Sequence, residues 1–223
     1  MIDLKDFIVI IPARGGSKRI PNKNIKLLNK KPLVAHSIEY SLKFFSKDRI
    51  WINSDSREIL NIGISYGINS YERTKELAKD DSKSIDVLKD QLKNINVDFK
   101  YVVLLQPTTP LRPDDLFEMA IDILNSNKIN SLFTVSPLDK KFGKFQKNKF
   151  IPLNYNFGQR SQDLNELFYE NGLLYITSKD LILKEKIIDK NSYPMITRGI
   201  ESTIDIDTEI DFQIAELIMK SWK

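Results

Sequence analysis

The segment from residue 8 to residue 31, IVIIPARGGSKRIPNKNIKLLNKK, most constrains what this chain can fold into. Its first four residues are apolar, and a loop with two adjacent glycines follows them. No Asp or Glu lies between Phe7 and Ile38, whereas cations recur there: Arg14, Lys18, Arg19, Lys23, Lys26, Lys30 and Lys31. A short apolar run before a glycine-containing basic loop predicts a buried strand whose end faces an anion.

This basic loop is best explained as a phosphate site. Gly15 and Gly16 let backbone N–H groups approach phosphate oxygens without a Cβ in the way, and the cations can neutralise several phosphate charges together. Neither the P-loop pattern G-x-x-x-x-G-K-[ST] nor the dinucleotide pattern G-x-G-x-x-G is present. We therefore expect a nucleoside triphosphate site of another kind; the alternative is a tight turn with solvated lysines.

Composition narrows the class of protein. A chain of 223 residues with 41% apolar and 29% charged residues fits one folded domain, expected over residues 1–223 with no second catalytic module. Its net charge of +4 is small and its cations are spread along the chain, so we expect no nucleic-acid partner. The absence of Cys excludes disulfides and thiolate catalysis. There is no signal peptide and no apolar run near the ~18 residues that span a bilayer, so we expect no membrane association and a cytoplasmic protein.

The order of predicted elements indicates an α/β fold. Apolar runs predict strands at residues 7–12, 49–53, 68–71, 101–105, 132–135, 173–177 and 193–197. Helical spacing predicts four helices between these strands: one at 32–46, one that ends near residue 66, one at 85–92 and one that ends near residue 124. Such alternation predicts a Rossmann-like, doubly wound and mostly parallel mixed sheet, with residues 101–105 at its centre. The single histidine, His36, lies away from the loops and is interpreted as a packing or interface residue.

Two further segments adjoin predicted strands. The motif QPTTPLR directly follows residues 101–105, and its prolines should end the strand and display Gln106, Thr108, Thr109 and Arg112 at the carboxyl edge of the sheet. Residues 139–165 break the strand–helix rhythm and are rich in aromatic and basic residues, which predicts an inserted β-hairpin arm, with a long surface loop as the alternative. The sequence YENG at residues 169–172 is typical of a turn.

Asp205 and Asp207 are the acidic counterpart of the basic loop. Apolar and acidic residues alternate over residues 204–207, which predicts a strand with both carboxylates on one face. A hard cation such as Mg²⁺ would relieve their repulsion and bridge them to phosphates; the alternative is a solvated strand face. Thr208 should cap a last helix whose core-facing stripe is Ile210, Ile214, Leu217 and Ile218.

Taken together, ARGGSK followed by KN, QPTTPLR, YENG and DIDTEIDF resemble the motifs of the acylneuraminate cytidylyltransferase family, the CMP-sialic acid synthetases. The motifs run in the family's order over nearly the whole chain. The resemblance implies a Rossmann-like dimer that transfers CMP from CTP to the anomeric hydroxyl of a sialic-acid-like nonulosonic acid, with Mg²⁺ and release of pyrophosphate. It also implies that residues 139–170 form a dimerisation arm, in which Lys141 or Lys144 faces the sugar.

The resemblance assigns roles to individual residues. The implied triphosphate and nucleotide contacts are Ala13, Arg14, Gly15, Gly16, Ser17, Lys23 and Asn24, with Arg73 and Ser84 at the cytidine. The implied sugar contacts are Gln106 and Arg160, and the implied metal ligands are Asp205 and Asp207. Arg14, Lys23 and the two aspartates would carry catalysis.

Departures from the family pattern leave the acceptor open. Arg19 stands where sialic acid members commonly have Gly, and Thr74 stands where Pro often follows the arginine. The segment SKRIPNKN resembles the pseudaminic acid branch, whereas QPTTPLR favours the sialic and legionaminic branches. The alternatives are a related nucleotidyltransferase for pseudaminate, Kdo or a sugar phosphate, or a non-catalytic nucleotide-binding protein.

Overall fold

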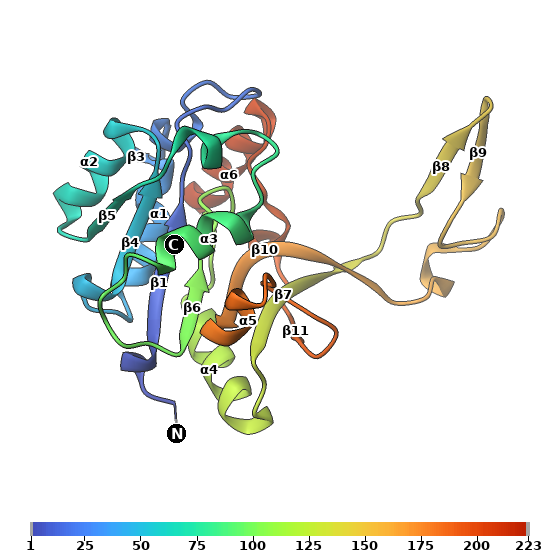
Figure 1. Cartoon of the computed structure of the whole chain (residues 1–223). Helices are drawn as coiled ribbons and strands as arrows, with labels where there is room; N and C mark the ends of the chain where they lie inside the picture. Colours follow the sequence, from blue (N-terminus) through green and yellow to red (C-terminus); the bar gives the residue numbers. More distant parts are fainter. Residues whose placement is uncertain (1, 222–223) are drawn as a thin grey trace.

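The computed structural model describes residues 2–221, which form a three-layer α/β body and a projecting arm (Figure 1). A seven-stranded sheet has the order β11-β7-β10-β6-β1-β4-β5. Its strands are β1 (Phe7–Pro12), β4 (Ile50–Ser54), β5 (Asn69–Glu72), β6 (Tyr101–Leu104), β7 (Ser131–Leu138), β10 (Leu167–Ser178) and β11 (Tyr193–Ile196). The helices are α1 (Leu33–Leu42), α2 (Arg57–Tyr66), α3 (Ser84–Leu92), α4 (Leu116–Asn127), α5 (Lys179–Leu183) and α6 (Glu209–Ser221). Two-residue strands β2 (Leu27–Leu28) and β3 (Lys31–Pro32) pair beside α6.

Strand β1 shows why the sheet is covered on both faces. Phe7, Val9 and Ile11 pack in one core with α1, α2 and α4, whereas Ile8 and Ile10 pack in a second core with α3 and α5. All five side chains are fully buried. A continuous apolar run rather than an alternating one is what such a doubly covered strand requires.

The expected mixed, mostly parallel sheet is confirmed. Strand β1 pairs in parallel with β4 and β6, and β4 pairs in parallel with β5. Strand β10 runs antiparallel to both of its neighbours, β6 and β7, while β11 is parallel to β7. Strand β6 occupies the middle of the seven, as predicted for residues 101–105.

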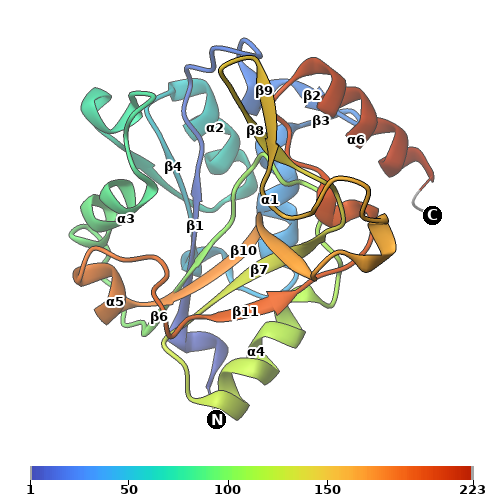
Figure 2. The ribbon, with the colours of Figure 1, turned by 90° about the vertical axis from the view of Figure 1, so that its right-hand side faces the viewer.

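The insertion after β7 forms an arm, as predicted. Its strands β8 (Gly143–Gln146) and β9 (Lys149–Pro152) make a separate antiparallel hairpin. Figure 1 shows that the hairpin stands away from the body, at the end of the long pair β7 and β10, and in Figure 2 it lies in front of the body, towards the viewer. Phe145 and Phe157 on this arm are 75% and 73% exposed, so the arm presents apolar surface to its surroundings.

Three local predictions were wrong. The YENG segment is a bulge within β10, between Glu170 and Tyr175, because both of its flanks pair with the same strand, β7. Residues 204–207 follow the 3-10 helix Ile200–Thr203 in extended form without joining a sheet; the Ile206 N–H donates instead to the Thr108 carbonyl, at 2.8 Å. The helix expected over residues 32–46 is shorter, and Pro32 stands at its N-cap.

A fourth prediction, concerning which face of α6 is buried, was also wrong. Ile210, Ile214 and Leu217 are exposed, whereas Phe212, Ala215 and Ile218 are buried. Phe212 and Ala215 pack against Ile20, Leu28, Leu33 and Ile206, a cluster supplied by the basic loop and its surroundings. Of the predicted stripe, only Ile218 faces the core.

Between residues 2 and 221, the helices are too short or too polar for any of them to cross a bilayer.

Candidate active site

A polar cleft of about 350 Å³ opens at the carboxyl ends of β1, β5 and β6. This edge is where open α/β sheets bind ligands. The cleft collects segments that are far apart in the sequence: the basic loop after β1, the loop after β5, the start of α3, the QPTTPLR loop and residues 205–207. The predicted residues that line it are Arg14, Ser17, Lys23, Asn24, Arg73, Ser84, Gln106, Asp205 and Asp207.

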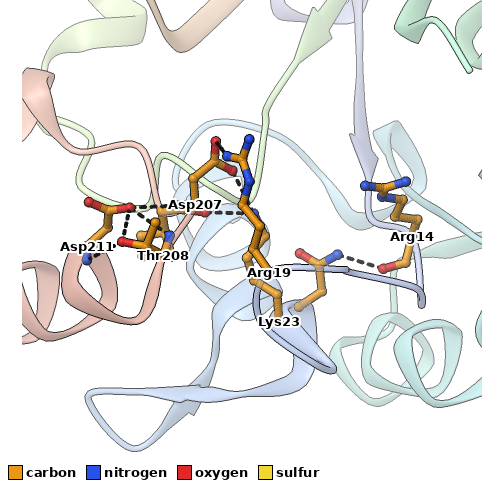
Figure 3. A network of polar contacts seen from close by, with 8 residues as sticks. Arg14, Arg19, Lys23, Asp207, Thr208 and Asp211 are labelled. Carbon is orange, nitrogen blue, oxygen red and sulfur yellow. Dashed lines mark hydrogen bonds and ion pairs between the residues drawn. The ribbon is translucent and has the colours of Figure 1, made fainter. Parts of the chain in front are cut away.

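Lys23 joins the basic loop to the acidic segment. Its side chain is only 12% exposed, and its Nζ donates to the Ile206 carbonyl at 2.6 Å and to Asp207 Oδ1 at 3.3 Å. Arg19 Nη1 donates to the other carboxylate oxygen of Asp207 at 2.7 Å (Figure 3). Two cations from one loop therefore hold one carboxylate at the rim of the cleft.

Asn24 shapes the loop itself. It is buried, and its Nδ2 donates to the Arg14 carbonyl at 2.8 Å. This bond fixes the position where β1 ends and the loop begins, so Arg14 leaves the sheet in a defined direction. Asn24 is thus both a wall of the cleft and a support for Arg14.

The glycines of the loop differ in their roles. The Gly15 N–H donates to Asp55 Oδ1 at 2.9 Å, and a Cβ on Gly15 would lie 2.8 Å from the Ser56 Cβ. Gly15 is therefore needed for close packing, and its amide is already occupied, contrary to the expectation of a free phosphate donor. Gly16 has open space around it. Ala13 is buried, and its N–H donates to the Asn53 carbonyl at 2.9 Å.

A second carboxylate, Asp80, pairs with two other cations of the loop. Asp80 Oδ1 accepts from Arg14 Nη1 at 2.5 Å, and Lys18 pairs with the other oxygen. The Lys18 and Arg14 charges hold the pKa of Asp80 below its usual value. Asp80 lies on the wall of the cleft, and no feature of its local sequence predicted a role there.

Asp205 and Asp207 face the same cleft, as predicted. Burial and the charge of Asp207 raise the pKa of the Asp205 carboxyl, while a hydrogen bond from Thr108 and the charge of Lys23 lower it. Repulsion of this kind favours a cation between the two carboxylates. Residues 2–221 hold no cluster of three potential His, Cys, Asp or Glu ligands. A metal here would therefore take its other ligands from phosphate and water, as Mg²⁺ commonly does.

Arg73 and Ser84 also line the cleft. Arg73 is buried, and its guanidinium donates to the carbonyls of Asn53 and Leu77, at 3.4 Å each. Burial lowers the pKa of Arg73 from its ordinary value. Ser84 is the first residue of α3, so the first turn of that helix, where N–H groups lack intrahelical partners, borders the cleft.

The QPTTPLR loop is only partly displayed, which corrects the prediction. Gln106 and Thr108 line the cleft, whereas Thr109 and Arg112 are buried behind it. The Arg112 guanidinium donates to the Leu173 carbonyl and the Gln106 carbonyl, both at 2.7 Å, and to the hydroxyls of Ser37 and Thr109, both at 3.1 Å. Burial lowers the pKa of Arg112 to about 10.

The arm cations are not part of this cleft. Arg160 pairs with Asp163 in a two-bond contact of 2.8 and 2.9 Å. Lys141 donates to the Gln159 carbonyl and lies over the Tyr155 ring, and Lys144 is on β8. The structure therefore does not bring Arg160 to the cleft of its own chain. His36 also lies elsewhere; its Nε2 is 3.0 Å from the Leu28 carbonyl.

A family model described as cytidylyltransferase matches residues 8–220. The chain belongs to the cytidylyltransferase family. Curated relatives of this cytidylyltransferase include the CMP-N,N'-diacetyllegionaminic acid synthase of Legionella pneumophila, which is 33% identical over 225 residues and 96% of each chain. The N-acylneuraminate cytidylyltransferase of Streptococcus agalactiae serotype III is 34% identical over 212 residues. That match covers 92% of this chain and 51% of the streptococcal protein, so the chain spans about half of that relative.

A solved structure supports the fold of this cytidylyltransferase. The CMP:2-keto-3-deoxy-manno-octonic acid synthetase complexed with CTP superposes with a TM-score of 0.72. The superposition covers 98% of this chain and all of that chain, at 13% sequence identity. At that identity the likeness establishes the fold, and the Rossmann-like expectation is confirmed.

Proposed function

We propose that this cytidylyltransferase transfers CMP from CTP to the anomeric hydroxyl of a nonulosonic acid and releases pyrophosphate. One observation carries the proposal: Lys23 joins the basic loop to Asp207 within a cleft that also holds Arg14, Arg73 and Gln106. The names of the relatives, a legionaminic acid synthase and an N-acylneuraminate cytidylyltransferase, support this class of acceptor.

The chemistry asks for positioning rather than for a protein nucleophile. The hydroxyl oxygen of the sugar acid attacks the α-phosphorus, the bond from that phosphorus to the bridging oxygen breaks, and pyrophosphate leaves as the hydroxyl proton is lost. Arg14 and Lys23 lie where they can neutralise the charge that builds on the phosphates. Arg73 and Ser84, which also line the cleft, are the proposed contacts of the cytidine, and Gln106 is the proposed contact of the sugar.

A divalent cation fits the acidic side of the cleft. Asp205 and Asp207 offer hard oxygen ligands. Burial raises the pKa of Asp205, and the charge of Asp207 adds to that shift through a repulsion that a cation would relieve. When bound, Mg²⁺ supplies positive charge to the triphosphate and the leaving pyrophosphate. With a metal on Asp207, its contacts with Arg19 and Lys23 would be given up, and both side chains would be available to the phosphates.

We further propose that the protein is a homodimer formed through the arm. Phe145, Leu153 and Phe157 are exposed on the arm, which stands away from the body, and exposed apolar surface of this kind marks interaction sites. Arg160 and the arm lysines cannot serve the cleft of their own chain from where they lie. A partner's arm is the route by which these cations would meet the acceptor's carboxylate.

Pyrophosphate release tests the function. The protein should release pyrophosphate from CTP only with an acceptor and Mg²⁺, and a panel of N-acetylneuraminate, legionaminate, pseudaminate and Kdo should identify the acceptor. Asp207→Asn should lower turnover at least 100-fold with the fold intact, because it removes one of two proposed metal ligands, whereas Asp122→Asn on α4 should change nothing. CTP binding without turnover on any sugar acid would contradict the proposal and favour a non-catalytic nucleotide-binding role.

A further inference from the structure

Gln106 contacts a small group of residues, which we call the platform, that limits the positions open to its side-chain amide. The platform is formed by Thr109 and Arg112 of the same loop and by the β10 bulge at Gly172 and Leu173. Gln106 itself follows β6 directly and lines the cleft. Arg112 and Thr109 bond to its backbone carbonyl, whereas Gly172 lies against its side chain.

Arg112 and Thr109 hold the backbone of the platform. Arg112 Nη2 donates to the Gln106 carbonyl and Arg112 Nε to the Leu173 carbonyl, both at 2.7 Å. Thr109 Oγ1 lies 3.0 Å from the Gly172 carbonyl, to which it donates, and 3.1 Å from the Gln106 carbonyl. Thr109 is fully buried and Arg112 is 4% exposed. The loop after β6 and the bulge of β10 are therefore joined by bonds shielded from water, where such bonds are strong.

Gly172 controls the side chain. Its φ is +73°, a conformation that residues with a Cβ rarely adopt. A Cβ on Gly172 would lie 2.5 Å from Gln106 Oε1 and 3.5 Å from the Thr109 methyl group. The first distance is too short for a real contact, so the amide end of Gln106 would have to move, while Thr109 could stay. The Gln106 amide thus occupies the space that a side chain on Gly172 would need.

We propose that Gly172 is a specificity-determining residue for the acceptor and that Arg112 is a positioning residue that acts through Gln106. The absence of a side chain at position 172 lets the Gln106 amide lie against β10, which leaves room in the cleft for the acceptor and aims the amide at it. Any side chain at position 172 moves the amide into the space of the acceptor. This inference rests on the proposed function, because Gln106 is the proposed contact of the sugar.

The test is Gly172→Ala, with Gly67→Ala as a matched control. Gly67 has nearly the same φ, +75°, but the atoms nearest to a Cβ there belong to the flexible Lys47 side chain. Both variants place a Cβ on a residue with positive φ, so both should lower the melting temperature. Gly172→Ala should raise the KM for the acceptor at least tenfold and leave the KM for CTP within twofold. Gly67→Ala should leave both KM values unchanged.

A second variant, Arg112→Lys, and the activity of the wild-type protein distinguish the possible outcomes. Arg112→Lys keeps the charge but loses the planar donor fork, and it should raise the acceptor KM in the same way with the CTP affinity retained. If Gly172→Ala keeps the wild-type acceptor KM, or loses CTP affinity to the same extent, the role of Gly172 is wrong. If Gly172→Ala did not fold while Gly67→Ala folded, the proposed role of Gly172 would also be overturned. The glycine would then be required for folding rather than for acceptor binding. A wild-type protein that turns over no sugar acid overturns the proposed function itself.

Discussion

At the scale of single residues, buried polar groups decide more of the site than exposed ones. The charged guanidinium of Arg112 is buried in the protein interior, where it donates hydrogen bonds to carbonyl and hydroxyl oxygens. Asn24 and Arg73 are likewise buried and bond to backbone carbonyls that border the cleft. Such groups are costly to leave unpaired, so they fix the chain where they bond. The cleft owes its shape to these contacts.

Replacement of Arg112 by Met should destabilise the protein by about 3 kcal/mol, since the change leaves buried carbonyl oxygens without donors. Urea denaturation measures the free energy of unfolding. Lys43→Met, which removes an exposed pair with Asp114 and a contact with the Tyr40 ring, should cost about 1 kcal/mol or less. Equal losses in the two variants would contradict the structural role of Arg112.

His36 should make stability depend on pH. Burial lowers its pKa below the ordinary 6.5, so the unfolded chain binds its proton more readily than the folded one. The free energy of unfolding should therefore fall as pH drops from 7.5 through 6.5 towards the lowered value. In His36→Gln, which keeps an N–H donor near the Leu28 carbonyl, this part of the slope should vanish. His36 is the only histidine in the chain, so an unchanged slope between pH 7.5 and 5.5 would rule out this origin.

At the scale of elements, tertiary contacts decided what local patterns left open. In α6, Ile210, Ile214 and Leu217 have helical spacing, but so do Phe212, Ala215 and Ile218. The second set is buried because Leu28 and Ile206, from distant segments, pack against it. The YENG segment has turn chemistry, yet it serves as a bulge because β7 is long enough to pair on both sides of it. Strand β1 and the end of α2 at Gly67 were predictable, since an apolar run and a glycine in the left-handed region act locally.

The arm should carry the assembly without carrying the nucleotide site. The double variant Phe145→Asp with Phe157→Asp should convert a dimer to a monomer in sedimentation velocity, because it places charges on the exposed apolar surface of the arm. CTP affinity should stay within twofold, since the cleft that would hold CTP is built from the body. Ile64→Asp, an equally drastic change on the exposed face of α2, should leave the assembly unchanged. A wild-type protein that sediments as a monomer would contradict the dimer.

At the scale of the whole molecule, the cleft is an arrangement of opposite charges from distant parts of the chain. The basic loop supplies cations near the N-terminus, and Asp80 and Asp207 meet them across 66 and 188 positions of sequence. The sequence pattern predicted Asp207 because its spacing from Asp205 is regular. It did not predict Asp80, whose polar neighbours are those of any solvated loop. Only the folded chain shows which carboxylate reaches Arg14.

Asp80 should compete with phosphate for Arg14 and Lys18. Asp80→Asn frees both cations, so it should tighten the binding of inorganic pyrophosphate without metal by roughly twofold to fivefold, in line with the modest strength of exposed ion pairs. Titration calorimetry at low ionic strength measures this affinity, because salt weakens exposed pairs. Asp81→Asn makes the same charge change one residue away and should leave the affinity unchanged. Equal tightening in both variants would show a general charge effect instead.

The bond between Lys23 and Asp207 also concerns how the protein is made. These residues are 184 positions apart, and domains assemble as the chain emerges from its N-terminus. During synthesis Arg19 and Lys23 are therefore made long before Asp207, and until then they lack this acidic partner. A complete cleft, with both Asp80 and Asp207 in place, cannot exist on a nascent chain that stops short of residue 207. The charge balance of the cleft is therefore completed only after residue 207 has been synthesised.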